Sequence, residues 1–230
     1  MCIIAVYDFK SGIRPTKQRV KNMMENNPDG VGIAYNNGKR VFMSKALANV
    51  EQVMEFFEGI PKGARDVVFH ARIATSGGIS AEKCHPYPLT TDDDLLNAKQ
   101  HLTKKAVVFH NGVLPVSIEK GKNDTQTFIK QSLAPLYNAS AEALKDGLFD
   151  ELIELAIRGS RIVIMYPDCV RLYGSGWEAD DGGVVYSNTS YTENTYKKWS
   201  KWDDEEWERY KNTRRTGYGY GTNGGRGVIV

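Results

Sequence analysis

The stretch Asn27–Met43, NPDGVGIAYNNGKRVFM, decides how this chain is built. Its first four residues form a turn signal, and Val31–Tyr35 is the apolar run of a strand. Asn36-Asn37-Gly38 is a second turn signal, and it leads into another strand-like run, Arg40–Met43. Because a short Asn/Gly turn between two such runs is typical of a β-hairpin, the stretch predicts an antiparallel pair of strands.

Outward from this hairpin, helical and strand patterns alternate. Apolar residues at helical spacing predict helices within Thr16–Asn26, Val50–Phe57 and Phe128–Ala156, the last of which has room for one or two. Short apolar runs predict strands at Cys2–Tyr7, Val67–Phe69, Ala106–Phe109, Ile162–Tyr166, Val170–Tyr173 and Val184–Tyr186. The mixture indicates an α/β or α+β fold with sheets covered by helices.

Two segments differ in composition from the rest of the chain. Thr90–Lys105 is polar and charged between two apolar runs, so we expect an exposed loop or hairpin. After a main domain at 1–191, we expect an amphipathic aromatic helix at 192–212 and a flexible Gly/Tyr/Arg-rich tail at 213–230. The aromatic stripe suits packing on the chain's own domain, and a binding surface is the alternative.

Composition bounds the class of protein. The chain has 230 residues, of which 41% are hydrophobic and 25% charged, as in ordinary soluble domains. No apolar run approaches the roughly 20 residues that span a bilayer, and no signal peptide is evident, so we expect no membrane partner. A net charge of +2 argues against nucleic acid, although the Arg/Gly/Tyr tail leaves a weak alternative. Only three scattered cysteines suit a reducing cytoplasm.

One of these cysteines, Cys2, directly follows Met1. Removal of the methionine would leave a thiol and a free α-amine on the same residue. An α-amine titrates at about 7.7–8.0 and can accept the proton of a thiol whose reference pKa is about 8.5. Cys2 is therefore a candidate nucleophile that carries its own base.

Polar signatures in the middle of the chain complete a candidate site. Arg72 lies in HARIATSG, just after an apolar run, and an arginine suits bidentate binding of a carboxylate. Asn111-Gly112 follows the next such run, and an Asn amide beside a Gly N–H forms a two-donor oxyanion hole. Asp124 in NDTQ suits a substrate ammonium group. Together these residues predict a pocket for an α-amino acid whose acyl group faces a nucleophile.

Each residue also has a plainer interpretation. Arg72 would serve in a structural ion pair, Asn111-Gly112 in a turn, and Asp124 as a helix N-cap. The four histidines and Cys84 have no spacing typical of a zinc site, so we expect no metal.

The ordered motifs resemble one family. Met-Cys, NPDGVGIAY, HARIATSG, HPYPL, FHNG and NDTQ follow one another as in class II glutamine amidotransferases, and the resemblance spans about Met1–Tyr191. It implies an α+β fold, the four-layer αββα sandwich of the N-terminal-nucleophile hydrolases. It also implies glutaminase chemistry through a γ-glutamyl thioester at Cys2, without a cofactor.

The resemblance assigns roles to individual residues. Asn111 and Gly112 match the oxyanion hole, and Arg72 matches the residue that binds the substrate α-carboxylate. Asp124 matches the residue that binds its ammonium group. Thr75 would line the pocket, and His85 of the His-Pro element would stand near it in a structural role. Ile3 departs from the Gly that many members carry, and Tyr186–Thr189 matches the family's serine-rich segment only weakly.

The implied partners are glutamine or a γ-glutamyl amide, and a separate synthetase that accepts the ammonia, because no synthetase motif or Gly-rich phosphate loop follows. Two alternatives stay open. One is a stand-alone hydrolase of a γ-glutamyl compound, and the other is a non-catalytic binding module with the same fold.

Overall fold

A computed structural model of the chain describes residues 2–74, 80–139 and 147–193. The chain is divided into two units, with the boundary after Thr192. The first unit, Met1–Thr192, contains every helix and strand given below. Thr75 and the aromatic stretch and tail after residue 193 lie outside the described residues, so the predicted boundaries at 192–212 and 213–230 stay predictions.

The larger of two sheets is seven-stranded and antiparallel at every pairing. Its strand order is β10-β11-β1-β4-β2-β3-β6. In that order the strands are Glu178–Ala179, Val185–Tyr186, Ile3–Asp8, Asp66–Ala71, Val31–Asn36, Val41–Leu47 and Gln100–Thr103. The predicted hairpin is confirmed, because β2 and β3 pair directly, with Asn36 opposite Val41.

The smaller sheet is four-stranded and also antiparallel, in the order β5-β7-β8-β9. These strands are Tyr87–Pro88, Val107–Asn111, Arg161–Met165 and Val170–Tyr173. The runs that the sequence marks as strands thus divide between two sheets, which periodicity along one strand does not reveal.

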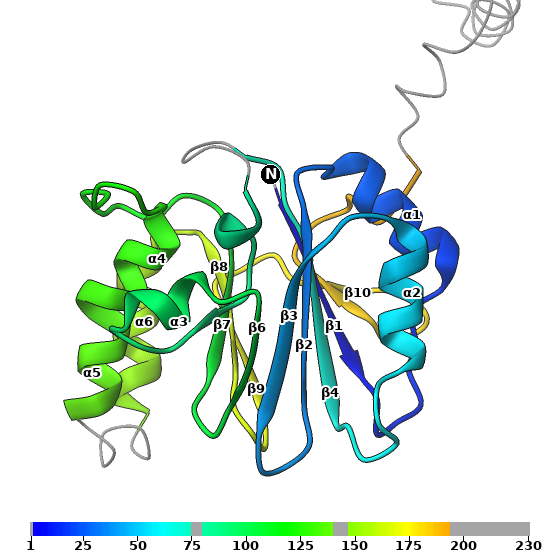
Figure 1. Cartoon of the computed structure of the whole chain (residues 1–230), viewed down its shortest axis with the longest axis horizontal. Coiled ribbons are helices and arrows are strands. Elements are labelled where there is room, and N and C mark those ends of the chain that lie inside the picture. Colours follow the sequence, from blue (N-terminus) through cyan, green and yellow to red (C-terminus); the bar gives the residue numbers. More distant parts are fainter. Residues whose placement is uncertain (1, 75–79, 140–146, 194–230) are drawn as a thin grey trace, which may run out of the picture. The chain divides into compact units, whose positions relative to one another are not determined.

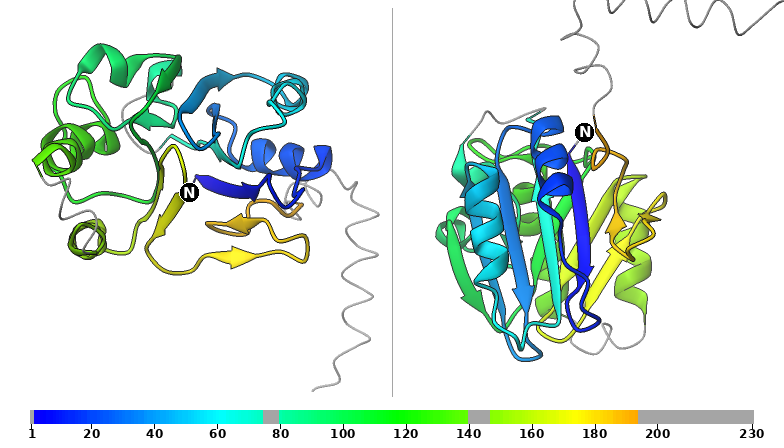
Figure 2. Two further views of the ribbon diagram at one scale, coloured as in Figure 1. Left: turned by 90° about the horizontal axis from the view of Figure 1, so that it is seen from below. Right: turned by 90° about the vertical axis from the view of Figure 1, so that its right-hand side faces the viewer.

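Helices cover each sheet on one face (Figures 1 and 2). The helices α1 (Lys17–Asn26) and α2 (Val50–Glu58) pack on the seven-stranded sheet through a core that contains Val20, Val53 and Tyr7. On the smaller sheet lie α4 (Asp124–Phe128), a π-helical turn (Ile129–Leu133), α5 (Ala134–Ala139) and α6 (Leu148–Ile157). The predicted helical region 128–156 therefore begins earlier, at residue 124.

The two sheets face each other across a third apolar core. The seven-stranded sheet contributes Ile4 and Val68, and the four-stranded sheet contributes Phe109 and Val163. Side chains alternate along a strand. Ile3, Ala5 and Tyr7 therefore point to the helices, whereas Ile4 points to the other sheet.

The segment Thr90–Lys105 is largely exposed, as expected, but it is neither a loop nor a hairpin. This segment contains α3 (Asp93–Asn97), which Asp92 caps, and β6, which pairs with β3 at the edge of the large sheet. Along β6 more exposed and less exposed residues alternate. An edge strand tolerates charged and polar residues, so its composition resembles that of a loop.

A 3₁₀ turn, Ala81–Lys83, leads to the cis peptide bond between His85 and Pro86. No described helix is long and apolar enough to cross a membrane.

Candidate functional site

One small cavity, of about 30 Å³, lies where several strands end, and we call it the Cys2 cavity. Its wall contains five of the predicted site residues: Cys2, Arg72, His85, Gly112 and Asp124. Ile73, His110, Asn123 and Thr125 complete the wall. Asn111 is buried next to it but is not part of the wall, and Thr75 lies outside the described residues.

Strand pairing brings Cys2 and Arg72 together. Antiparallel β1 and β4 place Ile3 opposite Ala71 and Ile4 opposite His70. The same register, continued by one residue, sets Cys2 opposite Arg72. The alternation that sends Ile4 toward the second sheet also sends the Cys2 side chain to that side.

The Cys2 thiol is half-buried and lies close to the backbone of Ile73. Its Sγ is 3.5 Å from both the N and the O of Ile73. Burial raises the pKa of the thiol, and the Ile73 backbone and the Arg72 charge oppose this shift. Since the net shift is upward, the thiol depends on a nearby base to become a nucleophile at neutral pH.

Arg72 is only 4% exposed, and its backbone is fixed on both sides. Its N–H donates to Gly30 O and its carbonyl accepts from Asp29 N, each at 2.9 Å. The turn Asn27–Gly30, which precedes β2, thus holds the residue that follows β4. A buried guanidinium at a cavity wall can present its planar set of donors to a carboxylate.

Asp124 is the first residue of α4, and it is not the helix cap. Asn123 is the N-cap: its side chain accepts from Gln126 N, and the Gln126 side chain accepts from Asn123 N. The N-cap interpretation of Asp124 is therefore wrong. Its carboxylate accepts from Thr125 N at 2.8 Å and from Leu114 N at 3.0 Å. A carboxylate has about four acceptor positions, so Asp124 retains capacity for a cationic group in the cavity.

Gly112 follows β7, with a φ of 144° that side chains rarely adopt. A Cβ at this position would also collide with Ser160. The glycine is therefore required by packing, and the lack of a side chain would let a ligand approach this part of the backbone closely.

Asn111 ends β7 and contacts Ser187 behind the cavity. The side-chain amide lies 2.9 Å from Ser187 Oγ through Nδ2, and Oδ1 is buried without a hydrogen-bond partner among the described residues. Ser187 Oγ already accepts from Ile4 N at 2.8 Å. Exchanging the amide oxygen and nitrogen gives the Ser187 proton an acceptor and turns the NH₂ group to the unpartnered side. Hydrogen-bond partners, not the shape of the amide, decide between these orientations. We therefore favour the exchanged one, which frees a donor.

His85 and His110 form part of the cavity wall, and His70, which is outside the wall, packs on His85. Thr125 Oγ1 lies 3.2 Å from His85 Nε2 and 2.9 Å from His110 Nδ1, and the rings of His85 and His70 are 4.3 Å apart. Burial lowers the pKa of His110 to about 4 and that of His70 to about 3, and it holds the pKa of His85 well below its usual value. The rings are therefore neutral at pH 7, and His85 has the contacts of a positioning residue.

Two residues that position Cys2 were not among the site residues predicted from the sequence. Ser187 bonds to the backbone of Ile4 in both directions, and Asn188 Nδ2 donates to the carbonyl of Cys2 at 2.6 Å. This pair fixes the start of β1. The only signal for it in the sequence is the weak match at Tyr186–Thr189.

The described residues contain no group of three or more His, Cys, Asp or Glu that could hold a metal ion. The cysteines Cys2, Cys84 and Cys169 are all free.

No protein-family model and no curated protein matches this chain. Among solved structures, it is similar to a glutamine phosphoribosylpyrophosphate amidotransferase from B. subtilis complexed with ADP and GMP, with a TM-score of 0.43 and 16% identity. It is also similar to a structure described as the allosteric regulatory enzyme of purine biosynthesis, with a TM-score of 0.46 and 15% identity. Each alignment covers 83% of this chain and 42% of the other. The chain thus spans less than half the length of either protein, and neither TM-score assigns it to a family.

Proposed function

We propose that this chain is a cytoplasmic glutaminase of the class II amidotransferase type, with the four-layer αββα sandwich of the N-terminal-nucleophile hydrolases. The observation that carries the proposal is the Cys2 cavity. Cys2, Arg72, Gly112 and Asp124 come from four separate segments, and all of them line it. These are the residues that the ordered motifs of the sequence single out.

In the proposed reaction, removal of Met1 first exposes the α-amine of Cys2. This amine takes the thiol proton, and the sulfur attacks the side-chain carbonyl carbon of glutamine. Asn111 Nδ2 and Gly112 N donate to the oxyanion that forms. The C–N bond then breaks, ammonia leaves with the transferred proton, and a γ-glutamyl thioester remains. Water cleaves the thioester to glutamate and restores the thiol.

Charge at the cavity wall supports an α-amino acid as substrate. Arg72 would bind the α-carboxylate and Asp124 the α-ammonium group, with Thr75 beside them. Paired charged hydrogen bonds of this kind are worth about 1.5–3 kcal/mol each. The neutral histidines would leave these two groups as the charges that orient the substrate.

The cavity is small for this substrate. A volume of about 30 Å³ suffices for a water-sized group. Glutamine binding therefore requires the wall of the cavity to open. The released ammonia would pass to a separate synthetase, and the reaction needs no cofactor.

Intact mass spectrometry before and after treatment with 6-diazo-5-oxo-norleucine tests the proposal. We expect loss of Met1 and one adduct, mapped to Cys2 and blocked by excess glutamine. Cys84, which is buried, and Cys169, which is half-buried, are internal control thiols and should stay unmodified. Processed protein that forms no adduct and does not release ammonia from glutamine or a γ-glutamyl amide, with or without an acceptor enzyme, would rule out the glutaminase. Retained Met1 without an adduct would favour the non-catalytic binding module.

A further inference from the structure

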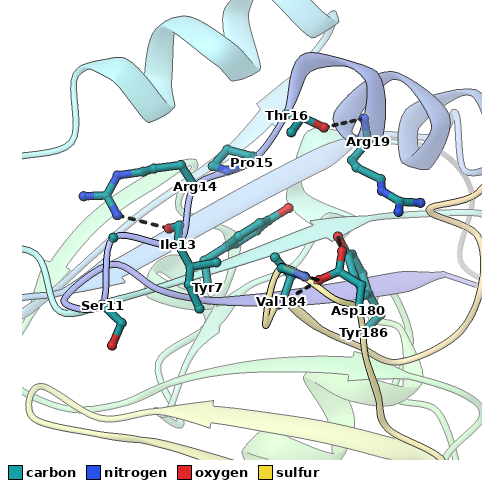
Figure 3. Close-up of a pocket in the computed structure, with 12 residues that line it drawn as sticks. Tyr7, Ser11, Ile13, Arg14, Pro15, Thr16, Arg19, Asp180, Val184 and Tyr186 are labelled. Carbon is teal, nitrogen blue, oxygen red and sulfur yellow. Dashed lines mark hydrogen bonds between the residues drawn. The ribbon is translucent and has the colours of Figure 1, made fainter.

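A second and larger cavity, of about 450 Å³, lies near the other end of β1, and we call it the Tyr7 pocket (Figure 3). Its wall comes from Tyr7 on β1, from the segment Ser11–Thr16 with Arg19 of α1, and from the strands and turn at Asp180–Tyr186. It shares no wall residue with the Cys2 cavity. Its volume is in the range of about 300–1,000 Å³ that is usual for small-molecule sites.

The phenol of Tyr7 is the first feature that points to a ligand. Tyr7 is completely buried, and its hydroxyl has no hydrogen-bond partner among the described residues. A buried hydroxyl without a partner destabilises a folded protein, so such groups usually have a role. Burial raises the pKa of Tyr7 well above its usual value, so the phenol keeps its proton and can donate it. In Figure 3 its hydroxyl end points to the side where Arg19, Asp180 and Tyr186 lie.

Positive charge in the pocket wall, from Arg19, is the second feature. The first turn of the ten-residue helix α1 contains no acidic residue, although acidic side chains are favoured there by the helix dipole. Instead it carries Lys17, which pairs with Glu51 at 3.3 Å outside the pocket wall, and Arg19, which is part of that wall. The Arg19 guanidinium lies 4.7 Å from the ring of Tyr191, which holds it in place. Arg14 also lines the pocket, but its guanidinium stacks on Phe9 and donates to the carbonyls of Phe9 and Ile13. An anion is the ligand that this wall would stabilise.

An acceptor lies across the pocket. Asp180 Oδ1 accepts from the N–H groups of Gly182 and Val184, each at 3.0 Å, and Oδ2 accepts from the Tyr186 hydroxyl at 3.3 Å. The backbone thus fixes the carboxylate, and Oδ2 retains acceptor positions for an N–H or O–H of a ligand.

We propose that the Tyr7 pocket binds a small organic anion whose carboxylate or phosphate accepts from Arg19 and Tyr7, and whose hydroxyl or amino group donates to Asp180. The proposal is independent of the glutaminase function, since it uses other residues and a separate cavity.

Calorimetric titration of the full chain with glycerol 3-phosphate and with glycerate tests the proposal and distinguishes phosphate from carboxylate. Both probes carry an anion and two hydroxyl groups. Sodium chloride at equal ionic strength is the control for general charge screening. We expect saturable binding of at least one probe and a matching rise in the unfolding midpoint. No binding of either probe beyond the chloride effect overturns the proposal.

Tyr7→Phe gives the sharper test because it removes only the unpartnered hydroxyl. Without a probe, the unfolding midpoint should stay or rise. With the probe, binding should weaken about tenfold to a hundredfold, the value of a hydrogen bond to a charged group. Arg19→Gln should weaken binding at least as much, whereas the exposed control Arg40→Gln should not. Unchanged binding by Tyr7→Phe, or a lower midpoint for this variant without a probe, contradicts the role given to the phenol.

Discussion

The two cavities stand at opposite ends and on opposite faces of the same strand, β1. Cys2 precedes the strand on the side of the second sheet, whereas Tyr7 lies five positions later and points to the helices. At about 3.3 Å per residue, some 17 Å separates the two positions. The Cys2 cavity is nearly filled by its own wall, but the Tyr7 pocket is open and leaves a buried hydroxyl without a partner. One strand can therefore support two sites of different chemistry, each of which can be altered alone.

The largest expected effect separates the two sites by activity. Cys2→Ala removes the nucleophile and should lower the rate of ammonia release from glutamine by at least about 10³-fold, since the reaction has no other covalent route. A coupled glutamate assay measures this loss, and circular dichroism checks the fold. Anion binding in the Tyr7 pocket should be unchanged. Residual turnover within tenfold of the parent chain would show that Cys2 is not the nucleophile.

The second prediction uses the buried histidines at the Cys2 end, where His85 and His110 line the cavity and His70 packs on His85. Burial lowers the pKa of His70 to about 3 and that of His110 to about 4, below the ordinary value of about 6.5 for an unfolded chain. The unfolded chain therefore binds more protons below pH 6.5. The stability due to the neutral rings is complete above that pH and is lost as the pH falls toward 4, by up to about 1.4 kcal/mol per pH unit for each ring.

Urea unfolding between pH 7 and pH 5, where most carboxylates stay ionised, measures this slope. Tyr7→Phe should show the same slope, because its phenol does not titrate there. A free energy of unfolding that is flat over this range would contradict neutral buried rings.

The third prediction concerns the glycine at the end of β7. Gly112→Ala places a Cβ against Ser160 and requires a positive φ, so it should lower the free energy of unfolding by about 1–3 kcal/mol. Gly63→Ala is the matched control, since a Cβ there meets nothing within 4 Å, and it should be neutral or slightly stabilising. Urea unfolding of both variants measures the difference. Equal stability would mean that the backbone at Gly112 adapts at no cost.

The fourth prediction isolates the charge at Asp124. The kcat/KM for glutamine should exceed that for an analogue without the α-amino group by about tenfold to a hundredfold. This factor corresponds to one charged hydrogen bond. Asp124→Asn should remove this preference and leave kcat/KM for the analogue nearly unchanged. Measuring kcat/KM of the parent chain and of the variant with both glutamine and the analogue tests this. Asp94→Asn, an exposed aspartate of α3, is the control and should keep the preference. A preference that survives Asp124→Asn would assign the ammonium group to another partner.

Sequence patterns predicted the residues of the Cys2 cavity better than those of the Tyr7 pocket, for a physical reason. Cys2, Arg72 and Gly112 lie in short motifs next to apolar runs. Cys2 and Arg72 flank paired strands of the large sheet, and Gly112 follows β7 of the sheet that faces it. The division of strands between two sheets and the pairing of β6 with β3 depend on tertiary contacts, which local patterns do not encode.

The Tyr7 pocket carried no such motif. Tyr7, Arg19 and Asp180 are far apart in the sequence, and each is ordinary in its local context. A ligand site is inferred for them only because the structure shows a buried phenol without a hydrogen-bond partner among the described residues and charged groups around it. Ser187 and Asn188 escaped for the same reason, since their contacts with Cys2 and Ile4 cross most of the chain.

The smallest expected effects come from two helix caps, one at each site. Thr16 caps α1 at the Tyr7 pocket, and Asn123 caps α4 at the Cys2 cavity. Loss of a cap costs typically about 1 kcal/mol. Thr16→Ala should lie at or below this value because Thr16 is exposed and its bond to Arg19 N is long, at 3.3 Å.

Asn123→Ala should cost about 1 kcal/mol more, because Asn123 Nδ2 also donates to the buried hydroxyl of Tyr87 at 2.6 Å, which the change leaves without this donor. Urea unfolding of the two variants compares the caps directly. Equal losses would mean that the Asn123–Tyr87 contact adds nothing to the cap, and that the wall of the Cys2 cavity is less tightly bound together than its hydrogen bonds indicate.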